Sequence, residues 1–415
     1  MKKIKLGKLI KVIHGFAFDS SKYIDKSEYR LVTLGNFKEG DNSFNYNDAK
    51  AKYTSECPEE RFILKEGDLI LPLIEQVVGL FGNTAFVPKA DDYKFVLNQR
   101  VGKIEIISSE VDKNYLHYLL ACSYVKKQLE DRASGTKQRN ISPDDVYDVQ
   151  VELPNIETQV KVGELLRSVE DKIAINNAIN DNLQQVIDAI YSQWFESFNF
   201  PNTNGKPYKQ FGGEMIQVPQ FKHKIPVNFK VVSFLDVCFW ETNSQPPKSE
   251  FIYEQKDGYV RFIQNRDYDS DSYKTYIPIT KSLSIVDELD ILMDKYGDAG
   301  KVRYGINGAF NVALAKIGVH KSNAKEYIRS YLSSKAIYTF LHNSCMASTR
   351  ASLNEDNLKP LFVTIPPDYL LDQFENKAHK IRCKMLENDK ENRQLKAIRD
   401  ELLPLLMNGQ ITIAD

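Results

Sequence analysis

The sequence of 415 residues predicts an α+β protein with two similar globular domains and two long helices. Three observations support this fold class. A heptad repeat of apolar residues occurs twice, the second copy lies 212 residues after the first, and strand-like alternation precedes each copy in the same order. We therefore expect an internal duplication about a pseudo-two-fold axis, in which the two helices pair as an antiparallel coiled coil.

The first heptad segment begins near Val162 and ends near Trp194. Its two seams are apolar apart from a pair of asparagines in the middle, a pattern typical of a long helix that pairs with another helix. At about 1.5 Å per residue such a helix spans roughly 50 Å, more than one compact domain needs. The seam residues are Val162, Leu166, Val169, Ile173, Asn176, Asn180, Leu183, Ile187, Ile190 and Trp194.

The second heptad segment repeats this stripe with one charged exception, Arg399. Both asparagines recur at the same offset, and Ile141 before the first helix recurs as Leu353. Each apolar seam needs a partner, so we expect the two helices to bury each other, with the asparagine layers fixing the register at some cost in stability. The alternative is that each helix packs only on its own domain. The seam residues are Phe374, Ala378, Ile381, Met385, Asn388, Asn392, Leu395, Leu402 and Leu406.

The duplication divides the chain into five predicted segments. Residues 1–154 form the first domain, 155–198 the central long helix that acts as a spacer, 199–227 a partly ordered linker rich in Pro and Gly, 228–367 the second domain, and 368–415 the C-terminal long helix and tail. The linker assignment depends on the loss of periodicity in that stretch.

Within the domains, the pattern predicts a strand over residues 5–13 and a second strand over residues 29–37. One helix is expected over residues 113–132, and its counterpart in the second domain over residues 327–343. Asp112 is the expected N-cap of the first of these helices.

Composition indicates a folded protein of a reducing compartment, which we expect to be the cytoplasm. Hydrophobic residues make up 42% and charged residues 27%, and the five cysteines are scattered without a Cys-x-x-Cys pair. No apolar run reaches the roughly 20 residues of a membrane span, and the lysine-rich start has no signal-peptide core. With 55 basic and 56 acidic residues, the total charge does not decide for or against nucleic acid, since a local basic patch is sufficient for binding.

No pattern in the sequence predicts catalysis or a metal site. The stretch Gly297–Lys301 is too short for a phosphate-binding loop, and the six histidines lack metal-ligand spacing. Pro366 and Pro367 suggest at first the Asn/Asp-Pro-Pro-Tyr loop of amino-methyltransferases. However, Asp368 separates them from Tyr369 and no glycine-rich cofactor loop accompanies them, so we interpret this stretch as a strand-to-helix turn. We expect no catalytic residue, no bound metal and no cofactor in this chain.

Basic, amide and aromatic residues alternate on predicted loops, a combination that can bind DNA. Arg and Lys pair with guanine, Asn and Gln pair with adenine, and cations pair with phosphate. In the first domain we predict DNA contacts from Lys22, Tyr23, Asn36, Lys38, Gln76, Asn98, Gln99, Arg100, Lys137 and Arg139. In the second domain we predict them from Trp240, Asn243, Gln264, Asn265, Arg266, Lys295, Tyr296, Lys301, Arg303, Tyr304 and Arg350. On composition alone this signal is weak, and ordinary solvated loops explain the pattern better than DNA binding does.

The stretches 75–83 and 294–305 connect matching strands but differ in length and chemistry. Two modules that bind different targets would differ in this way. Neutral drift of surface loops produces the same picture.

Four short motifs complete the pattern: residues 135–141 (Gly-Thr-Lys-Gln-Arg-Asn-Ile) with Leu153-Pro154 and Glu157-Thr158-Gln159, residues 191–195 (Tyr-Ser-Gln-Trp-Phe), residues 205–208 (Gly-Lys-Pro-Tyr), and residues 402–410 (Leu-Leu-Pro-Leu-Leu-Met-Asn-Gly-Gln). With the duplicated order of domain and helix, they make the chain resemble the specificity subunits of type I restriction-modification systems along nearly its whole length. The second copy departs from the first, because residues 348–353 lack the Gly and Gln of residues 135–141. Equal roles for the two loops therefore do not follow.

The resemblance implies two target-recognition domains, each reading one half of a gapped, asymmetric double-stranded DNA site. It further implies that the long helices set the spacing and dock two adenine-methyltransferase subunits, with restriction and translocase subunits joining through the complex. S-adenosylmethionine, ATP and magnesium would belong to those partners, and the complex would serve DNA methylation and phage defence. The alternative is a non-catalytic adaptor or orphan specificity protein that binds a protein partner or a DNA mimic. A self-sufficient methyltransferase or nuclease is disfavoured by the missing motifs.

Overall fold

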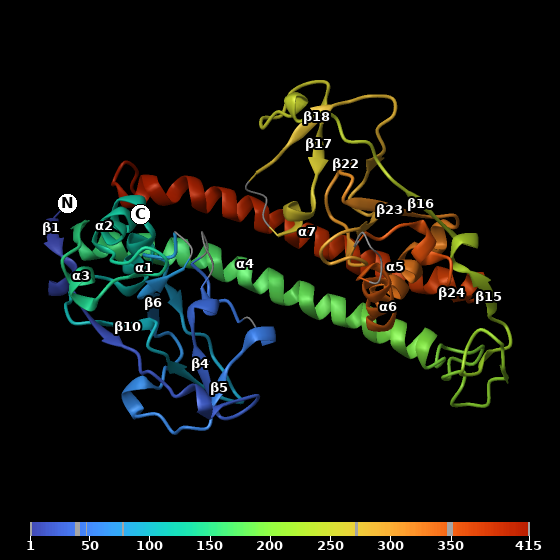
Figure 1. Ribbon diagram of the computed structural model, residues 1–415, viewed down its shortest axis with the longest axis horizontal. Helices are drawn as coiled ribbons and strands as arrows, with labels where there is room; N and C mark the ends of the chain where they lie inside the picture. The colour runs from blue at the N-terminus through green and yellow to red at the C-terminus, as the bar shows by residue number, and fades with distance from the viewer. Residues whose placement is uncertain are drawn as a thin grey trace. The chain divides into compact units, whose positions relative to one another are not determined.

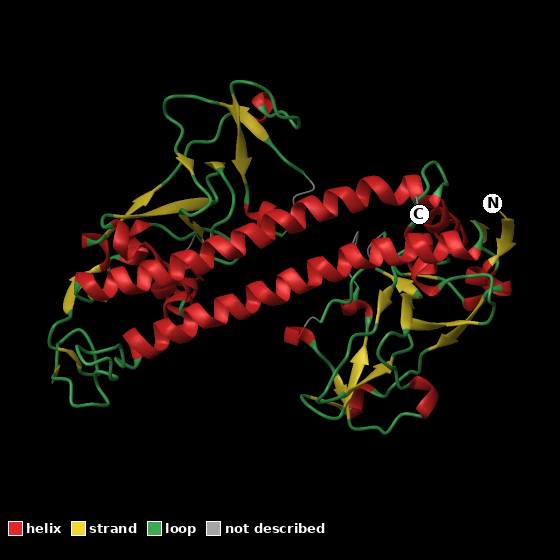
Figure 2. Cartoon of the chain, turned by 180° about the vertical axis from the view of Figure 1, so that it is seen from behind, coloured by secondary structure: helices red, strands yellow, loops and turns green. Residues whose placement is uncertain are grey.

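The computed structural model describes residues 2–37, 42–46, 48–76, 79–269, 273–346 and 352–413. The chain divides into two compact units. The first unit comprises Met1–Ile175 and Glu391–Asp415, and the second unit comprises Asn176–Lys390. Two long helices, α4 (Ile156–Tyr191) and α7 (Asp368–Met407), each contribute a part to both units (Figures 1 and 2).

Among the described residues, the strands of the first unit form four sheets. β1 (Lys2–Lys5) pairs with β12 (Gln150–Leu153), and β7 (Ile74–Glu75) pairs with β11 (Arg139–Asn140). The antiparallel sheet β2-β10-β6-β8 consists of Ile10–His14, Val101–Ile106, Leu69–Pro72 and Ala85–Phe86. The sheet β3-β5-β4-β9 consists of Tyr23–Ile24, Tyr53–Thr54, Tyr29–Val32 and Lys94–Leu97, and β4 runs parallel to β9.

The first domain is layered around the sheet β2-β10-β6-β8. On one face, Leu71 of the sheet shares a core with Leu116 of helix α1, and the neighbouring helices α2 and α3 belong to the same core. On the other face, Ile70 shares a second core with Val96 of β9. Successive strand residues point to opposite faces, which is why the consecutive Ile70 and Leu71 serve different cores. These helices are α1 (Lys113–Ala121), α2 (Ser123–Arg132) and α3 (Pro143–Tyr147).

The second unit repeats the order of the antiparallel sheet and the parallel strand pair of the first. β15 (Lys230–Ser233) pairs with β24 (Phe362–Ile365), as β1 pairs with β12. The antiparallel sheet β16-β23-β20-β21 consists of Cys238–Glu241, Leu314–Val319, Ile291–Asp294 and Val302–Arg303. The sheet β18-β17-β22-β19 consists of Tyr276–Pro278, Tyr259–Ile263, Gly308–Phe310 and Ile285–Val286, and β17 runs parallel to β22. Its helices are α5 (Lys325–Ser333) and α6 (Lys335–Met346).

Each domain has two helices where the sequence predicted one, so the continuous helices predicted over 113–132 and 327–343 are wrong. The first pair breaks at Cys122, with φ −65° and ψ 141°, and the second at Ser334, with φ −61° and ψ 141°. These extended residues lie 212 positions apart, so the break belongs to the duplicated unit. It turns the largely polar α2 away from the direction of the almost entirely buried α1, which one straight helix could not do.

The strand predicted over residues 5–13 is also interrupted. A 3-10 turn, Leu6–Lys8, separates β1 from β2. Leu6 and Leu9 are both fully buried. A continuous strand would place residues three apart on opposite faces, whereas the turn directs both side chains into one core.

The segment 199–227 is packed more closely than its composition predicted. Phe200 is fully buried, and its ring stacks on Tyr208 at 4.6 Å and on Phe229 at 5.4 Å between centroids. β13 (Met215–Ile216) and β14 (Ile225–Pro226) close the segment as a small hairpin sheet. Irregularly spaced aromatic residues hold it, and a search for periodicity does not detect them.

Within each unit, the parts of α4 and α7 run antiparallel. In the first unit Leu166 shares a core with Leu406, and Lys172 Nζ lies 3.2 Å from Glu391 Oε2. In the second unit Asn388 Nδ2 donates a hydrogen bond to Asn180 Oδ1 at 2.8 Å, and the Tyr191 ring lies 6.1 Å from that of Phe374. In both units the numbers on α7 fall as those on α4 rise.

Candidate nucleic-acid interface

In each unit, polar loops follow two parallel strands at the edge where both strands end. Val32 of β4 lies beside Leu97 of β9, and Ile263 of β17 lies beside Phe310 of β22. Because parallel strands end at the same edge, the loops that follow them start side by side. Several of the predicted DNA contacts lie in these loops.

One asparagine shapes this edge in each unit. Asn98 Oδ1 accepts a hydrogen bond from the backbone nitrogen of Arg100 at 3.4 Å, and Asn311 Oδ1 accepts one from Ala313 at 3.1 Å. Such side chains take the place of a backbone acceptor in a turn. Asn98 is only 6% exposed, so it supports the loop from inside, which argues against the predicted DNA contact. Sequence reasoning missed Asn311, although aligning the two strands residue by residue would have matched it to Asn98.

Asn36 is turned inward as well. It is 4% exposed, its Oδ1 accepts a hydrogen bond from Thr33 N at 2.8 Å, and its Nδ2 donates one to Asn45 O at 2.9 Å. In the second unit, Asn243 is 8% exposed and exchanges hydrogen bonds of 2.8 and 3.1 Å with the backbone of Ser284. Both amides use donor and acceptor within the fold, so the predicted base contacts are corrected to loop support.

Other members of the predicted set gather around β7 and β11 in the first unit. Gln76 directly follows β7, and Lys137 lies two residues before β11 begins; both side chains are exposed. The backbone nitrogen of Leu73 donates to the carbonyl of Arg100 at 3.0 Å, which brings the loop that carries the exposed Gln99 next to them. The structure thus places Gln76, Gln99, Arg100 and Lys137 on neighbouring segments.

Lys22 and Tyr23 belong to another part of the first unit. Tyr23 begins β3, which is the outermost strand of its sheet and is separated from β9 by β5 and β4. The Lys52 ammonium lies 5.6 Å from the centre of the Tyr23 ring, and the Lys22 side chain is exposed. These residues therefore do not join the group around Gln76. Lys38 lies outside the described residues.

Arg139 is engaged within the fold. Its Nη1 lies 3.0 Å from Glu75 Oε1, its Nη2 donates to the carbonyl of Glu130 at 2.7 Å, and its guanidinium lies 5.7 Å from the centre of the Phe81 ring. The side chain is 24% exposed. These contacts contradict the prediction of a side chain free to bind DNA.

Arg303 has a similar role in the second unit. Its Nε and Nη2 both donate to Asp294 Oδ2, at 3.1 and 2.9 Å, and its guanidinium lies 5.2 Å from the centre of the Tyr268 ring. Burial raises the pKa of Asp294 above its ordinary value, and the neighbouring Arg303 offsets part of this effect. Arg303 therefore anchors its loop, which corrects its predicted role as a DNA contact.

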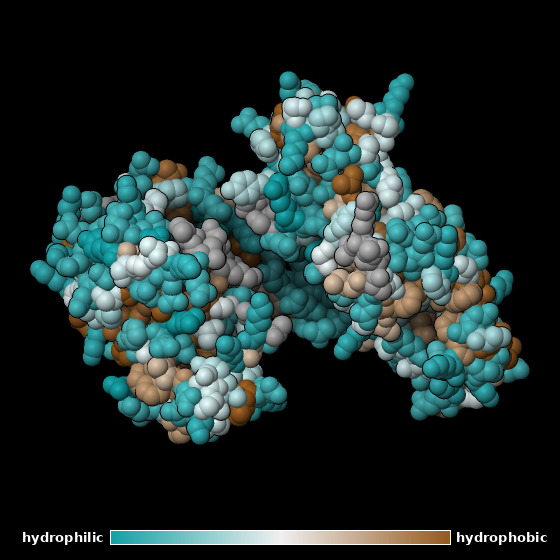
Figure 3. All heavy atoms as spheres, viewed as in Figure 1, coloured by the Kyte–Doolittle hydropathy of each residue, from teal (hydrophilic) through white to brown (hydrophobic). Residues whose placement is uncertain are grey.

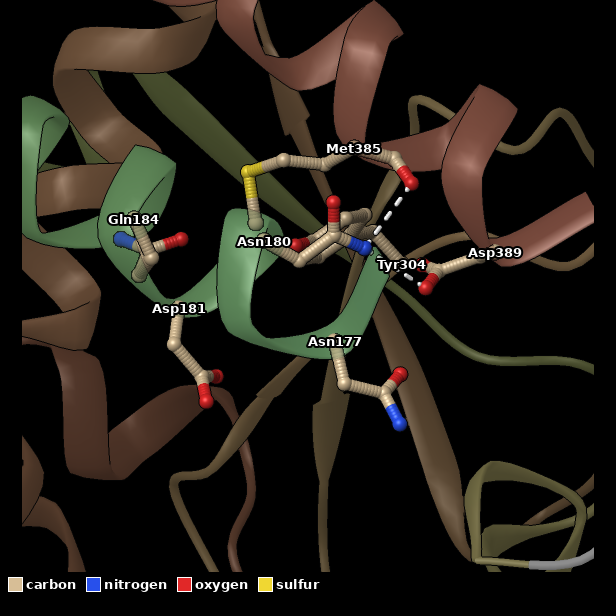
Figure 4. A pocket seen from close by; sticks show the side chains of 7 residues that line it. All are labelled: Asn177, Asn180, Asp181, Gln184, Tyr304, Met385 and Asp389. Atoms are coloured by element: carbon tan, nitrogen blue, oxygen red, sulfur yellow. Dashed lines mark hydrogen bonds between the residues drawn. The ribbon is translucent and has the colours of Figure 1, made fainter. Parts of the chain in front are cut away.

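Tyr304 points toward the long helices of its own unit. Its hydroxyl accepts a hydrogen bond from Arg382 Nη1 at 2.8 Å. Figure 4 shows Tyr304 in the wall of a cavity of about 360 Å³, into which Asn180 of α4 and Met385 of α7 also project. The remaining wall residues are Asn177, Asp181, Gln184 and Asp389. The Tyr304 hydroxyl is therefore engaged with α7, which argues against the predicted DNA contact.

In the second unit, the exposed members of the predicted set are Arg266, Tyr296 and Lys301. Arg266 follows β17 at the edge where the parallel strands end, whereas Lys301 Nζ lies 3.2 Å from Asp298 in the loop after β20. The half-buried members are Trp240, Gln264, Asn265 and Lys295. Trp240 packs against the core of the unit, so it is a poor candidate for a base contact. Arg350 lies outside the described residues.

On the face drawn in Figure 3, each domain presents a mainly hydrophilic surface with small, scattered apolar patches. Among the described residues, no group of three or more His, Cys, Asp and Glu side chains could hold a metal ion. None of the helices in the described ranges is long and apolar enough to cross a bilayer.

Comparisons with known proteins agree on one family. Residues 1–185 and 226–381 match the family described as Type I restriction modification DNA specificity domain. The chain is 24% identical over 323 residues to the MjaIX specificity subunit of Methanocaldococcus jannaschii, covering 74% of this chain and 70% of that protein. It is 24% identical over 413 residues to the HindI specificity subunit of Haemophilus influenzae, covering 84% and 87%. The crystal structure of the type I system S subunit from M. genitalium has a similar fold, with a TM-score of 0.62 and 13% identity over 98% of this chain and 95% of that chain.

Proposed function

The chain belongs to the family of type I restriction-modification DNA specificity proteins and provides DNA-target specificity, and we propose that each of its two domains reads one half of a gapped, asymmetric site. One observation carries this proposal: the two domains share the strand order of their antiparallel four-stranded sheet but expose different polar side chains on their loops. These side chains are Gln76, Gln99 and Lys137 in the first domain and Arg266, Tyr296 and Lys301 in the second. Two recognition domains that share a fold but differ in the residues that contact DNA recognise different DNA sequences.

In this proposal α4 and α7 form one antiparallel coiled coil that sets the distance between the half-sites. The antiparallel contacts within each unit support this arrangement. The seam asparagines support it too, because Asn176 is only 1% exposed and Asn180 only 8% exposed. A polar residue in an apolar seam favours one register over its neighbours. With a fixed register, the length of the helices determines the number of base pairs between the two half-sites.

We further propose that the helices dock two methyltransferase subunits and that restriction and translocase subunits join through them. The chain itself is then non-catalytic, and S-adenosylmethionine, ATP and magnesium bind to the partners. The sequence supports this division of labour, because it contains neither a phosphate-binding loop nor a glycine-rich cofactor loop.

The first test is to co-express the chain with its methyltransferase subunit and map N6-methyladenine across a plasmid library. A gapped, two-part, asymmetric motif is the expected result, and cells that lack this chain are the control. Replacing residues 1–154 with the corresponding domain of a relative should change one half of the motif and leave the other half intact. A stable complex without methylation would contradict the proposal and favour the adaptor function.

A second test asks whether the length of α4 and α7 sets the gap between the half-sites. Inserting one heptad into α4 and one into α7 lengthens each helix by about 10.5 Å, at about 1.5 Å per residue. With a rise of roughly 3.4 Å per base pair, the gap should grow by about 3 base pairs while both half-sites stay the same. Methylation mapping of the variant measures both quantities, and an unchanged gap would contradict the spacer role.

A further inference from the structure

We propose that the ion pair Glu75–Arg139 is a positioning device for DNA recognition, holding the exposed Gln76 and Lys137 in place and thereby setting which bases one half-site accepts. The proposal rests on the proposed function, in which the first domain reads one half-site. Glu75 was not among the predicted DNA contacts, and Arg139 was predicted to bind DNA directly. The structure assigns both residues a role behind the contact surface.

Glu75 is the last residue of β7 and binds backbone groups that follow it in the chain. It is 1% exposed, and its Oε2 accepts backbone hydrogen bonds from Gly79 at 3.2 Å, Leu80 at 3.1 Å and Phe81 at 3.3 Å. Three consecutive backbone donors converge on one carboxylate oxygen, and hydrogen bonds to a charged acceptor are stronger than those to a neutral one. These bonds hold residues 79–81 against Glu75, the last residue of β7.

Arg139 compensates the charge of this carboxylate. Its Nη1 lies 3.0 Å from Glu75 Oε1, an oxygen that has no aligned hydrogen-bond donor within the described part of the chain. The same guanidinium donates to the carbonyl of Glu130 in α2 and lies beside the ring of Phe81. The pair therefore ties the loop after β7 to the end of α2 and to β11.

The position of the pair connects it to recognition. The exposed Gln76 directly follows Glu75, and the exposed Lys137 lies two residues before Arg139. Removing one partner of a buried ion pair leaves an uncompensated charge, so the surrounding loop has to rearrange. Such a rearrangement moves the side chains on both sides of the pair. In the second domain a differently built pair, Asp294–Arg303, anchors the corresponding stretch from within one hairpin.

The test uses the complex of the full chain with its methyltransferase subunits and a set of duplexes that carry each single base-pair substitution of the wild-type motif. Wild type should discriminate roughly 5- to 150-fold at each specific base pair, measured as a ratio of Kd values. Glu75→Gln and Arg139→Ala should reduce this ratio toward 1 in one half-site and leave the other half unchanged. Arg139→Lys should give an intermediate loss, because lysine keeps the charge but makes fewer hydrogen bonds.

Asp148→Asn is the matched control, because it removes a carboxylate from an exposed ion pair of the same domain, with Lys5 Nζ at 2.7 Å. It should leave the whole discrimination profile unchanged. Asp294→Asn should reduce discrimination in the opposite half-site from Glu75→Gln, which assigns each half to its domain.

Unchanged discrimination by Glu75→Gln, or an equal loss in both halves, would overturn the proposal. Failure of the proposed function gives a different result, namely a wild-type complex that does not discriminate between the duplexes. If circular dichroism shows that Glu75→Gln does not fold, Arg139→Lys decides: a loss in one half supports the proposal, and a wild-type profile overturns it.

Discussion

In each unit a glutamate lies beside an arginine of α7, but the glutamate belongs to a different element. In the first unit Glu170 of α4 lies between His117 of α1 and Arg399 of α7, each at 3.6 Å. In the second unit Glu326 of α5 lies between Arg329, at 3.0 Å, and Arg382 of α7, at 3.4 Å. Arg329 and Arg382 stand 212 residues after His117 and Glu170, so two corresponding positions carry different chemistry.

This comparison shows what the duplication has kept. In both units α7 supplies an arginine, whereas the acid comes from the long helix α4 in the first unit and from the domain helix α5 in the second. A buried charge is tolerated when a partner of opposite sign lies beside it, whichever element carries it. Each unit therefore keeps a glutamate beside an arginine of α7, although a different element carries the glutamate. Arg399, the charged exception in the apolar seam, is explained by Glu170.

The largest effect on the free energy of unfolding should come from breaking the ion pairs of Glu326 with Arg329 and Arg382. Glu326 is 1% exposed, and Glu326→Ala leaves the buried guanidiniums of Arg329 and Arg382 without their carboxylate. Loss of one partner of a buried pair typically costs about 3–5 kcal/mol. Urea unfolding of the full chain should show this loss in the free energy of unfolding. The control Asp368→Asn removes the exposed pair with Lys321 and should leave the unfolding midpoint unchanged.

A smaller effect should follow from breaking the asparagine layer. Asn388→Ala removes the donor to Asn180 Oδ1, while Asn180 Nδ2 keeps its bonds to Met385 O at 3.1 Å and Asp389 Oδ1 at 2.8 Å. A buried acceptor left without a donor costs about 1–3 kcal/mol. Replacing both asparagines with leucine should restore the free energy of unfolding. A single alanine variant as stable as wild type would show that the layer does not stabilise the pair.

The contributions of Glu170 and Glu375, two glutamates of the long helices, to the stability of the fold should depend on pH in opposite directions. Burial raises the pKa of Glu170, but His117, Tyr118 and Arg399 outweigh it, and the net pKa lies below the ordinary 4.5. A lowered pKa stabilises the fold above the unfolded-state value and loses that contribution as pH falls through the folded-state value. The stability advantage of wild type over Glu170→Gln should therefore be present at neutral pH and shrink below pH 4.5.

Glu375 should show the opposite sign. Burial raises its pKa to about 7, with a contribution from the charge of Glu326, while the backbone N–H of Glu326 counteracts it. A raised pKa of an acid destabilises the fold above that pKa, and the penalty disappears as pH falls toward the unfolded-state value. Glu375→Gln should thus be more stable than wild type above pH 7 and equal to it below pH 4.5. Thermal melts from pH 4 to 8 measure both variants, and parallel pH profiles would contradict the distinction.

The smallest effect on the free energy of unfolding should come from replacing Asn98 or Asn311, the asparagines that shape the two loop turns. Asn98→Ala and Asn311→Ala each remove one hydrogen bond of 3.4 or 3.1 Å, worth about 0.5–1.5 kcal/mol. Each should weaken discrimination by its own domain, which the duplex set with single base-pair substitutions can measure. Loss in the same half-site for both variants would contradict the equivalence of the two loops.

The periodic features of the fold could be predicted from the sequence. Heptad positions such as Val162 and Phe374 are only 2% and 1% exposed. A helix buries residues at a regular spacing, and that spacing is visible directly in the sequence. The N-cap at Asp112 is confirmed by its hydrogen bond from Tyr115 N at 2.8 Å, since capping is a local interaction. The same reasoning overlooked the helix break at Cys122, because an extended residue there interrupts no pattern of side chains.

The candidate site could be predicted in outline only. Loop composition singled out Gln76, Gln99 and Lys137, which the structure leaves exposed, but it also selected Asn36, Arg139 and Tyr304, which are engaged inside the fold. Composition shows that a side chain can bind a base. The direction of that side chain depends on residues distant in sequence.

By itself, the sequence determined the duplication, the apolar seams and the family, because each is written in residue type and spacing along one chain. Only the tertiary structure decided which polar side chains face outward, since Arg139 meets Glu75 and Tyr304 meets Arg382 across separations that no local pattern records. Burial and charge compensation are properties of neighbours in space, and the fold brings those neighbours together.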